Sequence, residues 1–424
     1  MDKKTYRTYV DILREELVPA MGCTEPIAVA YAGALARQTL GVMPEAVELV
    51  VSGNIIKNVK SVIVPNTGGR KGLRAAVAAG ICCGNADREL EVLSEVTEEQ
   101  LAVMDAYLQT ARFSIRESDA SCPFDIRVTV SNGSDSAYVQ IIGHHTNVVS
   151  IRRNDTVIVD IPFQDEVIQA PENRSLLNVE DIVAFADQVD IEEVRPILQR
   201  QIDHNMAIAH EGLERHYGAE IGRILLRSYG NSVQNRAKAW AAAGSDARMN
   251  GCEKPVVINS GSGNQGLTAS VPVIVYAQER GASEEQLFRA LVVSNLVTIH
   301  LKTGIGSLSA YCGATSAGAG AGAGICYLYG GRYKEIAHTV VNTLAINSGM
   351  FCDGAKASCA AKIASAVEAG LLGMQMYIHD SQFYGGDGIV VKGVENTICA
   401  VSRIARDGMR STDSEIIRLM MQND

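Results

Sequence analysis

The sequence predicts an α+β protein in which a mostly helical domain adjoins a smaller α+β domain that carries a meander sheet. Three observations lead to this prediction. The chain of 424 residues is longer than one hydrophobic core usually supports. Runs of β-branched residues gather between positions 46 and 159. From about position 200 onward, alanine- and leucine-rich segments follow one another and are separated by glycines.

Two helices are expected at the start of the chain. Residues 4–17 carry apolar side chains at the helical period. They lead to Met-Gly-Cys-Thr-Glu-Pro at 21–26, whose proline suits the first turn of a second helix through residue 38. Cys23 is therefore expected at the entrance of a helix.

β-branched runs indicate strands in the next part of the chain. The first two runs, at 47–51 and 59–64, are broken by Ser-Gly-Asn at 52–54. Further strand patterns, separated by turn residues, occupy positions 127–130, 138–142, 148–151 and 157–159. Because short turns join these runs, we expect consecutive strands to pair as a meander.

The second half of the chain is expected to be helical, and the first two helices resemble it more than they resemble the strand-rich block. We therefore predict a helical domain made of residues 1–40 and 200–424, with residues 41–199 as an α+β domain. The alanine- and glycine-rich stretch at 313–324 lacks the bulky apolar residues of a membrane span. A tightly packed interior helix is expected there.

Composition favours small molecules as partners. The formal net charge is −10 and no long basic run is present, which argues against nucleic acid and against an anionic membrane. The N-terminus has no apolar stretch of the kind an export signal needs, so the cytoplasm is expected. The ten cysteines are then expected as free thiols. A homo-oligomer, most simply a symmetric dimer, is the base-rate expectation.

Three cysteines stand close together in the helical half. Cys312 lies forty residues before Cys352, and Cys359 follows seven residues later. On one continuous helix, seven residues would separate the last two by about 10 Å, which is awkward for a shared metal site. We therefore expect a turn at Asp353-Gly354, with a helix starting just after it. Spacing alone leaves ordinary buried cysteines as an open alternative.

The sequence motifs around these cysteines are more specific than the spacing of the cysteines. Gly-Cys-Thr-Glu-Pro at 22–26, Leu-Ser-Ala-Tyr-Cys-Gly at 308–313 and Cys-Asp-Gly-Ala-Lys-Ala-Ser-Cys at 352–359 occur in this order. Together with Ile-Ile-Gly-His-His-Thr-Asn at 141–147, they resemble the L-cysteine desulfidase family, a group similar to the α subunit of serine dehydratases. The resemblance covers nearly the whole chain. Iron–sulfur L-serine dehydratases are its wider relatives.

The resemblance implies a catalytic helical domain with a 4Fe–4S cluster held by three cysteines, which leaves one iron open to the substrate. By position, Cys312, Cys352 and Cys359 correspond to these ligands. In the serine dehydratases the last two cysteines are further apart than here. The implied reaction eliminates sulfide from L-cysteine and gives pyruvate, ammonia and hydrogen sulfide. An L-serine ammonia-lyase with the same cluster is the alternative.

The chemistry of elimination suggests roles for the first motif. Sulfide is a poor leaving group unless its charge is stabilised, and an open iron can do this as a Lewis acid. Cys23 either completes the cluster or acts as an acid/base thiol. We prefer the second role, because a helix N-terminus favours a thiolate. Its neighbours Thr24 and Glu25 are expected at the substrate.

Candidates for proton transfer and substrate binding lie in two further motifs. His145 is the best candidate for moving a proton, since imidazole titrates near neutral pH, and a surface histidine is the alternative. Thr146 and Asn147 are expected to contact the substrate beside it. Lys356 is a catalytic candidate that could hold the substrate carboxylate or lower the charge on the cluster, and Asp353 is expected to bind the substrate.

A glycine-rich loop at 259–266 follows a strand-like segment and offers backbone amides that suit a carboxylate. Its expected substrate contacts are Ser260, Gly261, Ser262 and Asn264. The loop also spells GxGxxG, but Pro272 falls where a dinucleotide-binding fold needs an uninterrupted helix.

Two rival functions remain at this point. The glycine-rich loop also resembles the phosphate loop of enzymes that perform such eliminations with pyridoxal phosphate. The nearby upstream lysines, Lys238 and Lys254, do not stand in the setting of a Schiff-base lysine. The second rival is a non-catalytic amino-acid or redox sensor that retains the cluster. Lys302 is a weaker site candidate, since an ordinary snorkelling lysine would look identical.

Overall fold

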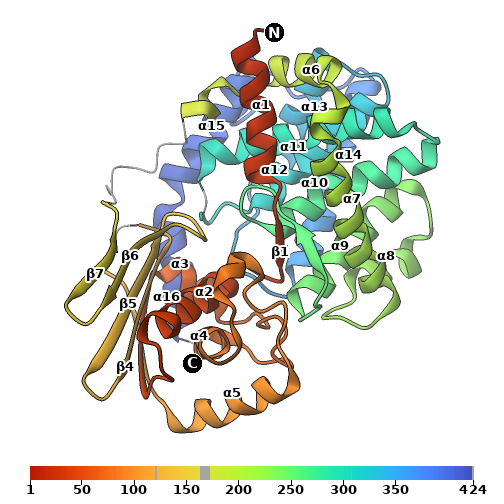
Figure 1. Ribbon diagram of the computed structural model, residues 1–424. Helices are drawn as coiled ribbons and strands as arrows, with labels where there is room; N and C mark the ends of the chain where they lie inside the picture. Colours follow the sequence, from red (N-terminus) through yellow and green to blue (C-terminus); the bar gives the residue numbers. More distant parts are fainter. Residues whose placement is uncertain (120–121, 163–171, 307, 423–424) are drawn as a thin grey trace.

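The computed structural model describes residues 1–119, 122–162, 172–306 and 308–422 (Figure 1). It confirms the predicted α+β class, because a mostly helical molecule carries one mixed six-stranded sheet. Figure 1 shows the sheet on one side of the molecule and the larger helical region on the other. None of the helices within the described ranges has the length and apolar character needed to cross a membrane.

The elements follow one another in two blocks and a closing helix. The first block contains α1 (Lys3–Glu16), β1 (Pro19–Met21), α2 (Thr24–Leu40), β2 (Ala46–Val51), α3 (Gly53–Val59), α4 (Gly72–Cys83), η1 (Ala86–Glu91), α5 (Glu98–Thr110), β3 (Arg112–Glu117), β4 (Asp125–Asn132), β5 (Asp135–Ile142), β6 (Val148–Arg153) and β7 (Thr156–Asp160). The second contains η2 (Glu172–Leu176), α6 (Val179–Gln188), α7 (Ile191–Glu214), α8 (Ile221–Tyr229), α9 (Val233–Met249), β8 (Pro255–Val257), α10 (Gly263–Arg280), α11 (Glu284–Ile305), α12 (Gly313–Leu328), α13 (Tyr333–Ile346), α14 (Cys359–Ile378), α15 (Val394–Arg403) and η3 (Ile404–Gly408). The chain closes with α16 (Arg410–Gln422).

The sheet has the order β3-β2-β4-β5-β6-β7. Strands β4 to β7 pair antiparallel with their sequence neighbours, which confirms the predicted meander. The remaining strands extend it, because β2 pairs antiparallel with β4 and parallel with β3. Strand β3 was not expected from the sequence pattern.

The strand predicted at 59–64 is wrong. Helix α3 spans Gly53–Val59, and the chain then turns, with a single bridge between Ile63 and Lys71. Val59, Val62 and Val64 are fully buried. Their β-branched side chains therefore fill the interior from a helix end and a turn, and this packing overrides their preference for strands.

Two hydrophobic cores divide the chain. One contains α2, α4 and the inner face of the sheet, and the other contains α1 together with most of the helices from α6 onward. Helix α2 lies against α4 so closely that a Cβ on Gly80 would come 1.9 Å from the Ala30 carbonyl oxygen. The cores thus separate after α1 and again before α6, whereas the predicted domain limits lie at residues 40 and 199. Those limits stay a prediction.

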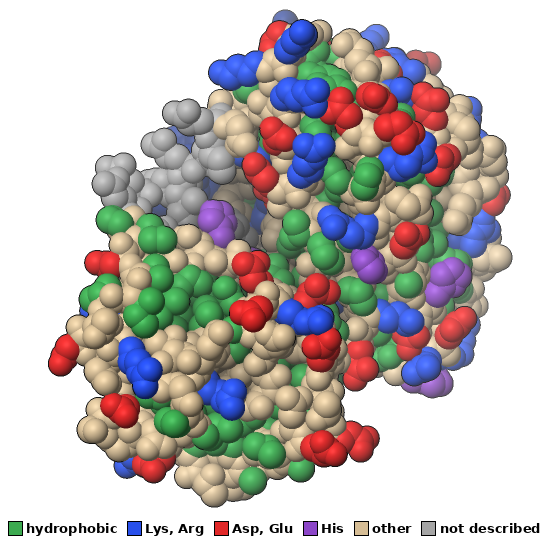
Figure 2. Space-filling model, in the orientation of Figure 1, with side chains coloured by type: hydrophobic (Ala, Val, Ile, Leu, Met, Phe, Trp, Pro, Cys, Tyr) green, Lys and Arg blue, Asp and Glu red, His purple; other side chains and the backbone are tan. Residues whose placement is uncertain are grey.

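Two contacts position the site, the first within the helical core and the second between the two cores. Strand β1 pairs antiparallel with β8, with Ala20 opposite Val256, so the start of α2 lies beside the loop that follows β8. At the other end of the chain, α16 lies on α3, where the Lys60 ammonium donates to the Met420 carbonyl at 2.5 Å. Figure 2 shows acidic and basic side chains interspersed over both parts of the molecule on this face.

Candidate active site

A short antiparallel pairing brings Cys312 and Cys352 together. Tyr311 pairs with Phe351 as an isolated bridge, and the Cys312 N–H donates to the carbonyl of Met350 at 3.1 Å. Each cysteine follows a paired residue by one position, and side chains alternate between faces along extended backbone. The two cysteines are therefore placed on the same face of this pairing.

A turn after Cys352 brings the third cysteine, Cys359, back toward the other two. Residues 352–358 are not helical, and Gly354 has a φ of +91°, which favours glycine. A Cβ at Gly354 would come 2.2 Å from the Lys57 carbonyl oxygen, so a larger residue would collide with α3. Cys359 then begins α14. As expected, Cys352 and Cys359 do not lie on one continuous helix.

The three cysteines line a single cavity of about 110 Å³. We call Cys312, Cys352 and Cys359 the cysteine group. The same cavity is lined by a second set, the polar group, which consists of Cys23, Glu25, Arg248, Asn264 and Gln265. Both cores contribute, because Lys57 and Asn58 of α3 also line it.

Four helices begin at this cavity. Cys23, Ser262 and Cys312 are the N-caps of α2, α10 and α12, and Cys359 is the first residue of α14. The first N–H groups of a helix lack partners within the helix and carry partial positive charge. Among the described residues, these N-caps make no side-chain capping bond. The starts of α2, α10 and α12 therefore offer unused N–H donors to an anion, whereas the first N–H groups of α14 donate to the carbonyls of Lys356 and Ala357.

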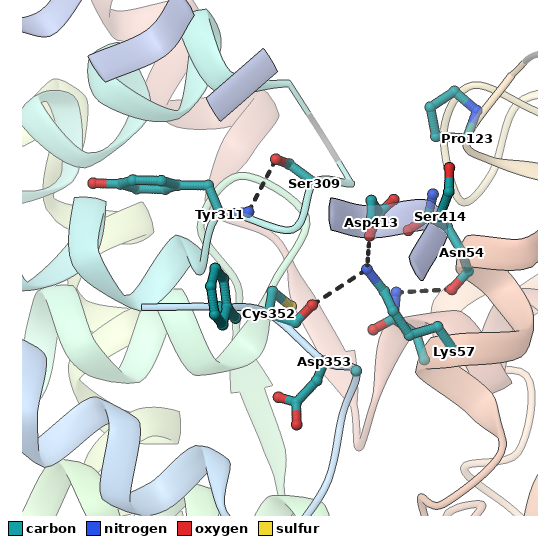
Figure 3. Close-up of polar contacts among 12 residues, drawn as sticks. Asn54, Lys57, Pro123, Ser309, Tyr311, Cys352, Asp353, Asp413 and Ser414 are labelled. Carbon is teal, nitrogen blue, oxygen red and sulfur yellow. Dashed lines mark hydrogen bonds and ion pairs between the residues drawn. The ribbon is translucent and has the colours of Figure 1, made fainter. Parts of the chain in front are cut away.

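Three lysines that line the cavity, Lys57, Lys302 and Lys362, add positive charge to it. The Lys57 side chain is 1% exposed, and its ammonium contacts the Asp413 carboxylate at 2.5 Å and the Cys352 carbonyl at 3.4 Å (Figure 3). Lys362 is paired with the carboxylate of Asp353. Lys302 is buried, and this burial lowers its pKa to about 8.

Cys23 and its neighbours form a hydrogen-bonded group at the start of α2. The Cys23 thiol donates to the Glu25 carboxylate at 3.1 Å, and the Thr24 hydroxyl donates to the Gly261 carbonyl at 3.0 Å. Burial, and then the charge of Glu25, raise the pKa of the Cys23 thiol well above its usual value. The expected position at a helix N-terminus is confirmed, but burial outweighs the helix effect and favours the protonated thiol.

His145 lies in the turn after β5, and its side chain approaches Gly261 beside the start of α2. Its ring packs edge-on against Phe124 at 4.8 Å between centroids, and a Cβ at Gly261 would come 3.2 Å from its Cε1. Among the described residues, its buried Nε2 has no hydrogen-bond partner. Burial lowers the pKa of His145, so the ring is neutral at pH 7 and can accept a proton.

Comparison with known proteins gives a family for this chain. The family described as "Serine dehydratase alpha chain" matches residues 87–418. The chain belongs to the serine dehydratase alpha chain family. A UPF0597 protein of Desulfitobacterium hafniense is 56% identical, over 98% of this chain and 97% of the relative. One of Treponema denticola is 48% identical over the whole of both chains, and one of Lachnoclostridium phytofermentans is 49% identical over 98% of this chain and all of the relative.

Membership in the serine dehydratase alpha chain family indicates a lyase-type enzyme related to the iron–sulfur serine dehydratases. The cavity brings together many of the residues that the sequence singled out. It is lined by the cysteine group and by Cys23, Glu25, Ser262 and Asn264. Thr24, Gly261 and His145 adjoin it through the contacts described above.

Besides His145, Thr24 and Gly261, five more predicted residues are not among the described residues that line the cavity, namely Lys356, Asp353, Thr146, Asn147 and Ser260. The Lys356 ammonium contacts the Asp353 carboxylate at 2.5 Å. The Asn147 amide donates to the Ile142 carbonyl at 2.8 Å and closes the turn that carries His145. The predicted contacts of these five residues with a substrate stay predictions.

Sequence reasoning missed several cavity residues, namely Arg248, Lys57, Asn58, Gln265 and Lys362. The sequence places the charged residues Asp246 and Arg248 in an alanine-rich segment, which is a weak signal, and only the structure shows that Arg248 is buried. Lys57 gave no comparable signal, because its role depends on the return of α16.

The donor set fits the iron–sulfur cluster that the family implies. All three members of the cysteine group are free thiols, and thiolate is the usual ligand of such clusters. Burial, and then the neighbouring Cys352, raise the pKa of Cys312 to about 12, so its thiolate needs a compensating positive charge. Within the described ranges, no three His, Cys, Asp or Glu side chains could share one metal ion. Each cysteine of a cluster binds a different iron, so a cluster does not require three ligands around one ion.

Proposed function

We propose that this chain is an iron–sulfur lyase that eliminates sulfide from L-cysteine to give pyruvate, ammonia and hydrogen sulfide. The observation that carries the proposal is one cavity lined by both the cysteine group and the polar group. The first suits a metal cluster, and the second suits a small zwitterion. Family membership supports a lyase, and the motifs around the cysteines resemble the desulfidases.

Cys312, Cys352 and Cys359 would hold a 4Fe–4S cluster. When bound, a cluster with one open iron supplies a Lewis acid that stabilises the departing sulfide or hydroxide. The helix N-termini at Cys312 and Cys359, with Lys57 and Lys302, make the site favourable for negative charge. The protein thereby lowers the cost of burying thiolates together.

The reaction requires no net oxidation. The Cα–H and Cβ–S bonds of L-cysteine break, and the electron pair of the Cα–H bond forms the double bond of 2-aminoacrylate. Sulfide leaves with the electron pair of the Cβ–S bond and takes up protons. Tautomerisation and hydrolysis then give pyruvate and ammonia. His145 is the proposed proton acceptor, because burial keeps its ring neutral and its Nε2 free of partners among the described residues.

Cys23 is proposed as a proton donor beside the substrate. Its thiol is buried and donates to the Glu25 carboxylate, which also lines the cavity, so a proton given up by Cys23 can be replaced through this hydrogen bond. Thr24 fixes the start of α2 against the Gly261 carbonyl and so holds Cys23 in place.

L-serine is the second candidate substrate, and the family description favours it. Replacing sulfur by oxygen leaves the carboxylate and the ammonium unchanged, so both amino acids make the same demands on the polar group. We further propose that the enzyme works in the cytoplasm as a homo-oligomer, most simply a dimer.

The test is to purify the protein without oxygen, measure iron and acid-labile sulfide, and assay pyruvate from L-cysteine and L-serine in one preparation. The proposal expects about four irons per chain, activity lost in air, and faster turnover of L-cysteine. Faster turnover of L-serine would assign the serine reaction. Iron without turnover would indicate a sensor, and iron-free activity sensitive to hydroxylamine would indicate pyridoxal phosphate.

A further inference from the structure

Arg248 is a buried cation that has no partner within the part of the chain that the structure describes. It lies in the last turn of α9 and is 2% exposed, yet among the described residues no carboxylate pairs with it. Its Nε is buried and makes no hydrogen bond there. A guanidinium stays charged in proteins, and burying it unpaired is costly. A buried arginine that lines a cavity is therefore suited to an anionic ligand.

The surroundings of Arg248 point to the kind of anion. A Cβ on Gly263 would come 2.3 Å from the Arg248 Nε, so the guanidinium lies directly on the first residue of α10. The first N–H groups of that helix are unused within the helix. Arg248 and these amides together offer several converging donors, which is an arrangement suited to a carboxylate.

Unused acceptors lie next to these donors. Asn264 Oδ1 and Gln265 Oε1 are buried and have no partner among the described residues. Both line the cavity, as does the carboxylate-bearing Glu25. The Gln265 amide lies against Gly313, where a Cβ would come 2.7 Å from its Cδ, so close packing at the start of α12 restricts its position. Acceptors of this kind suit an ammonium group.

We propose that Arg248 binds the α-carboxylate of the substrate and that Asn264 and Gln265 accept hydrogen bonds from its α-ammonium. This inference rests on the proposed function, since it takes the substrate to be an amino acid. Donors and acceptors on adjacent residues fit a free zwitterion and disfavour amides, peptides and decarboxylated amines. With its carboxylate and ammonium bound in this way, the substrate has only its side chain free to face the cysteine group.

The test uses the oxygen-free holoprotein and two readouts. The first is the rise of the thermal midpoint with L-alanine, which has no leaving group, compared with propionate and ethylamine. The second is KM and kcat for L-cysteine. Arg248→Gln should abolish the L-alanine shift and raise KM about 100-fold, the range expected when a charge-assisted hydrogen bond is lost. At saturation, kcat should change less than KM.

Arg236→Gln is the matched control. Arg236 lies on the same helix and is paired with Glu279 outside the cavity. Both readouts should stay at wild-type values in this variant. If Arg248→Gln does not fold, the variants Arg248→Lys and Gln265→Met test the proposed binding site in its place. Each should fold, raise KM about tenfold and weaken the L-alanine shift, because a lysine lacks the planar fork and a methionine lacks the acceptor.

The outcomes separate this inference from the reaction. It is overturned if L-alanine does not stabilise the wild-type protein better than propionate and ethylamine do. It is also overturned if the Arg248 variants keep the L-alanine shift and a KM near the wild-type value. L-alanine binding that depends on Arg248, without pyruvate from L-cysteine or L-serine, would support the inference and refute the proposed reaction.

Discussion

The cysteine group and the polar group line the same cavity but are assembled differently. Cys312, Cys352 and Cys359 come from one part of the helical region, and a bridge and a turn bring them together. The polar group is collected from the start of α2, the end of α9 and the start of α10. Local sequence thus specifies the first group, while tertiary packing specifies the second.

The two groups also differ in how their charges are satisfied. Around the cysteine group, Lys57 and Lys362 are already paired with carboxylates. In the polar group, Arg248, Asn264 and Gln265 keep buried atoms without partners among the described residues. Unused donors and acceptors indicate where a ligand has to supply the missing bonds. This difference suggests a fixed cofactor at the first group and an exchanging substrate at the second.

The largest expected effect comes from removing a cysteine ligand. Cys352→Ser should lose most of its iron and reduce pyruvate formation to background, because two cysteines hold a cluster poorly. Iron and acid-labile sulfide measured in oxygen-free preparations check this. Cys399→Ser, at an exposed position on α15, is the control and should keep both. A Cys352→Ser protein with full iron would break the assignment of the cysteine group.

Cys23 tests whether the two groups are distinct. Cys23→Ala should keep the iron of the wild type and lower kcat by about 100-fold or more, because it removes a proton donor and leaves the cluster ligands in place. The measurement pairs iron content with turnover of L-cysteine. Loss of iron in this variant would instead make Cys23 a fourth ligand and move it into the cysteine group.

His145 gives a prediction with a pH dependence. His145→Asn should lower kcat about 100-fold, the usual contribution of a general base. Because burial lowers its pKa below the usual 6.5, wild-type activity should persist as the pH falls to that value. Activity should then decline at lower pH as the ring gains a proton.

The neighbouring His144 provides the control for this prediction, since it is exposed and His144→Asn should leave the pH profile unchanged. The pH profile of kcat/KM checks both variants. An acid limb centred above 6.5, or one that persists in His145→Asn, would contradict the assigned role.

The smallest effect concerns the contact between α16 and α3. Asp413→Asn should lower the free energy of unfolding by about 3 kcal/mol, because Lys57 loses its buried partner. It should also speed iron loss, since Lys57 holds the Cys352 carbonyl. Glu415→Gln is the control on the same helix, where the pair with Arg418 is exposed and contributes little. Denaturant unfolding and the rate of iron release measure both effects. Equal values for the two variants would show that α16 does not stabilise the site through the Lys57–Asp413 pair.

The fold could be predicted as far as local patterns reach. The meander strands, the first two helices and the interior helix at 313–324 follow from hydrophobic periodicity and turn residues. The segment at 59–64 could not be predicted, because its valines are buried by tertiary packing. The assignment of α2 to the sheet core likewise depends on close packing at Gly80, which leaves no pattern in the sequence.

The candidate site shows the same limit. Motifs around Cys23, Cys312, Cys352 and Cys359 brought these residues forward, and the cavity contains all four. Arg248 escaped notice, because its importance lies in the absence of a partner among the described residues. That property is visible only once the surrounding side chains are placed.

We propose that one cavity holds a cluster on the cysteine group and an amino acid on the polar group. An anomalous difference map at the iron edge, from crystals grown without oxygen in the presence of L-alanine, tests it most directly. We expect iron density bounded by the sulfurs of Cys312, Cys352 and Cys359, with the L-alanine carboxylate on Arg248. Iron density at another place, or L-alanine bound away from this cavity, would contradict it.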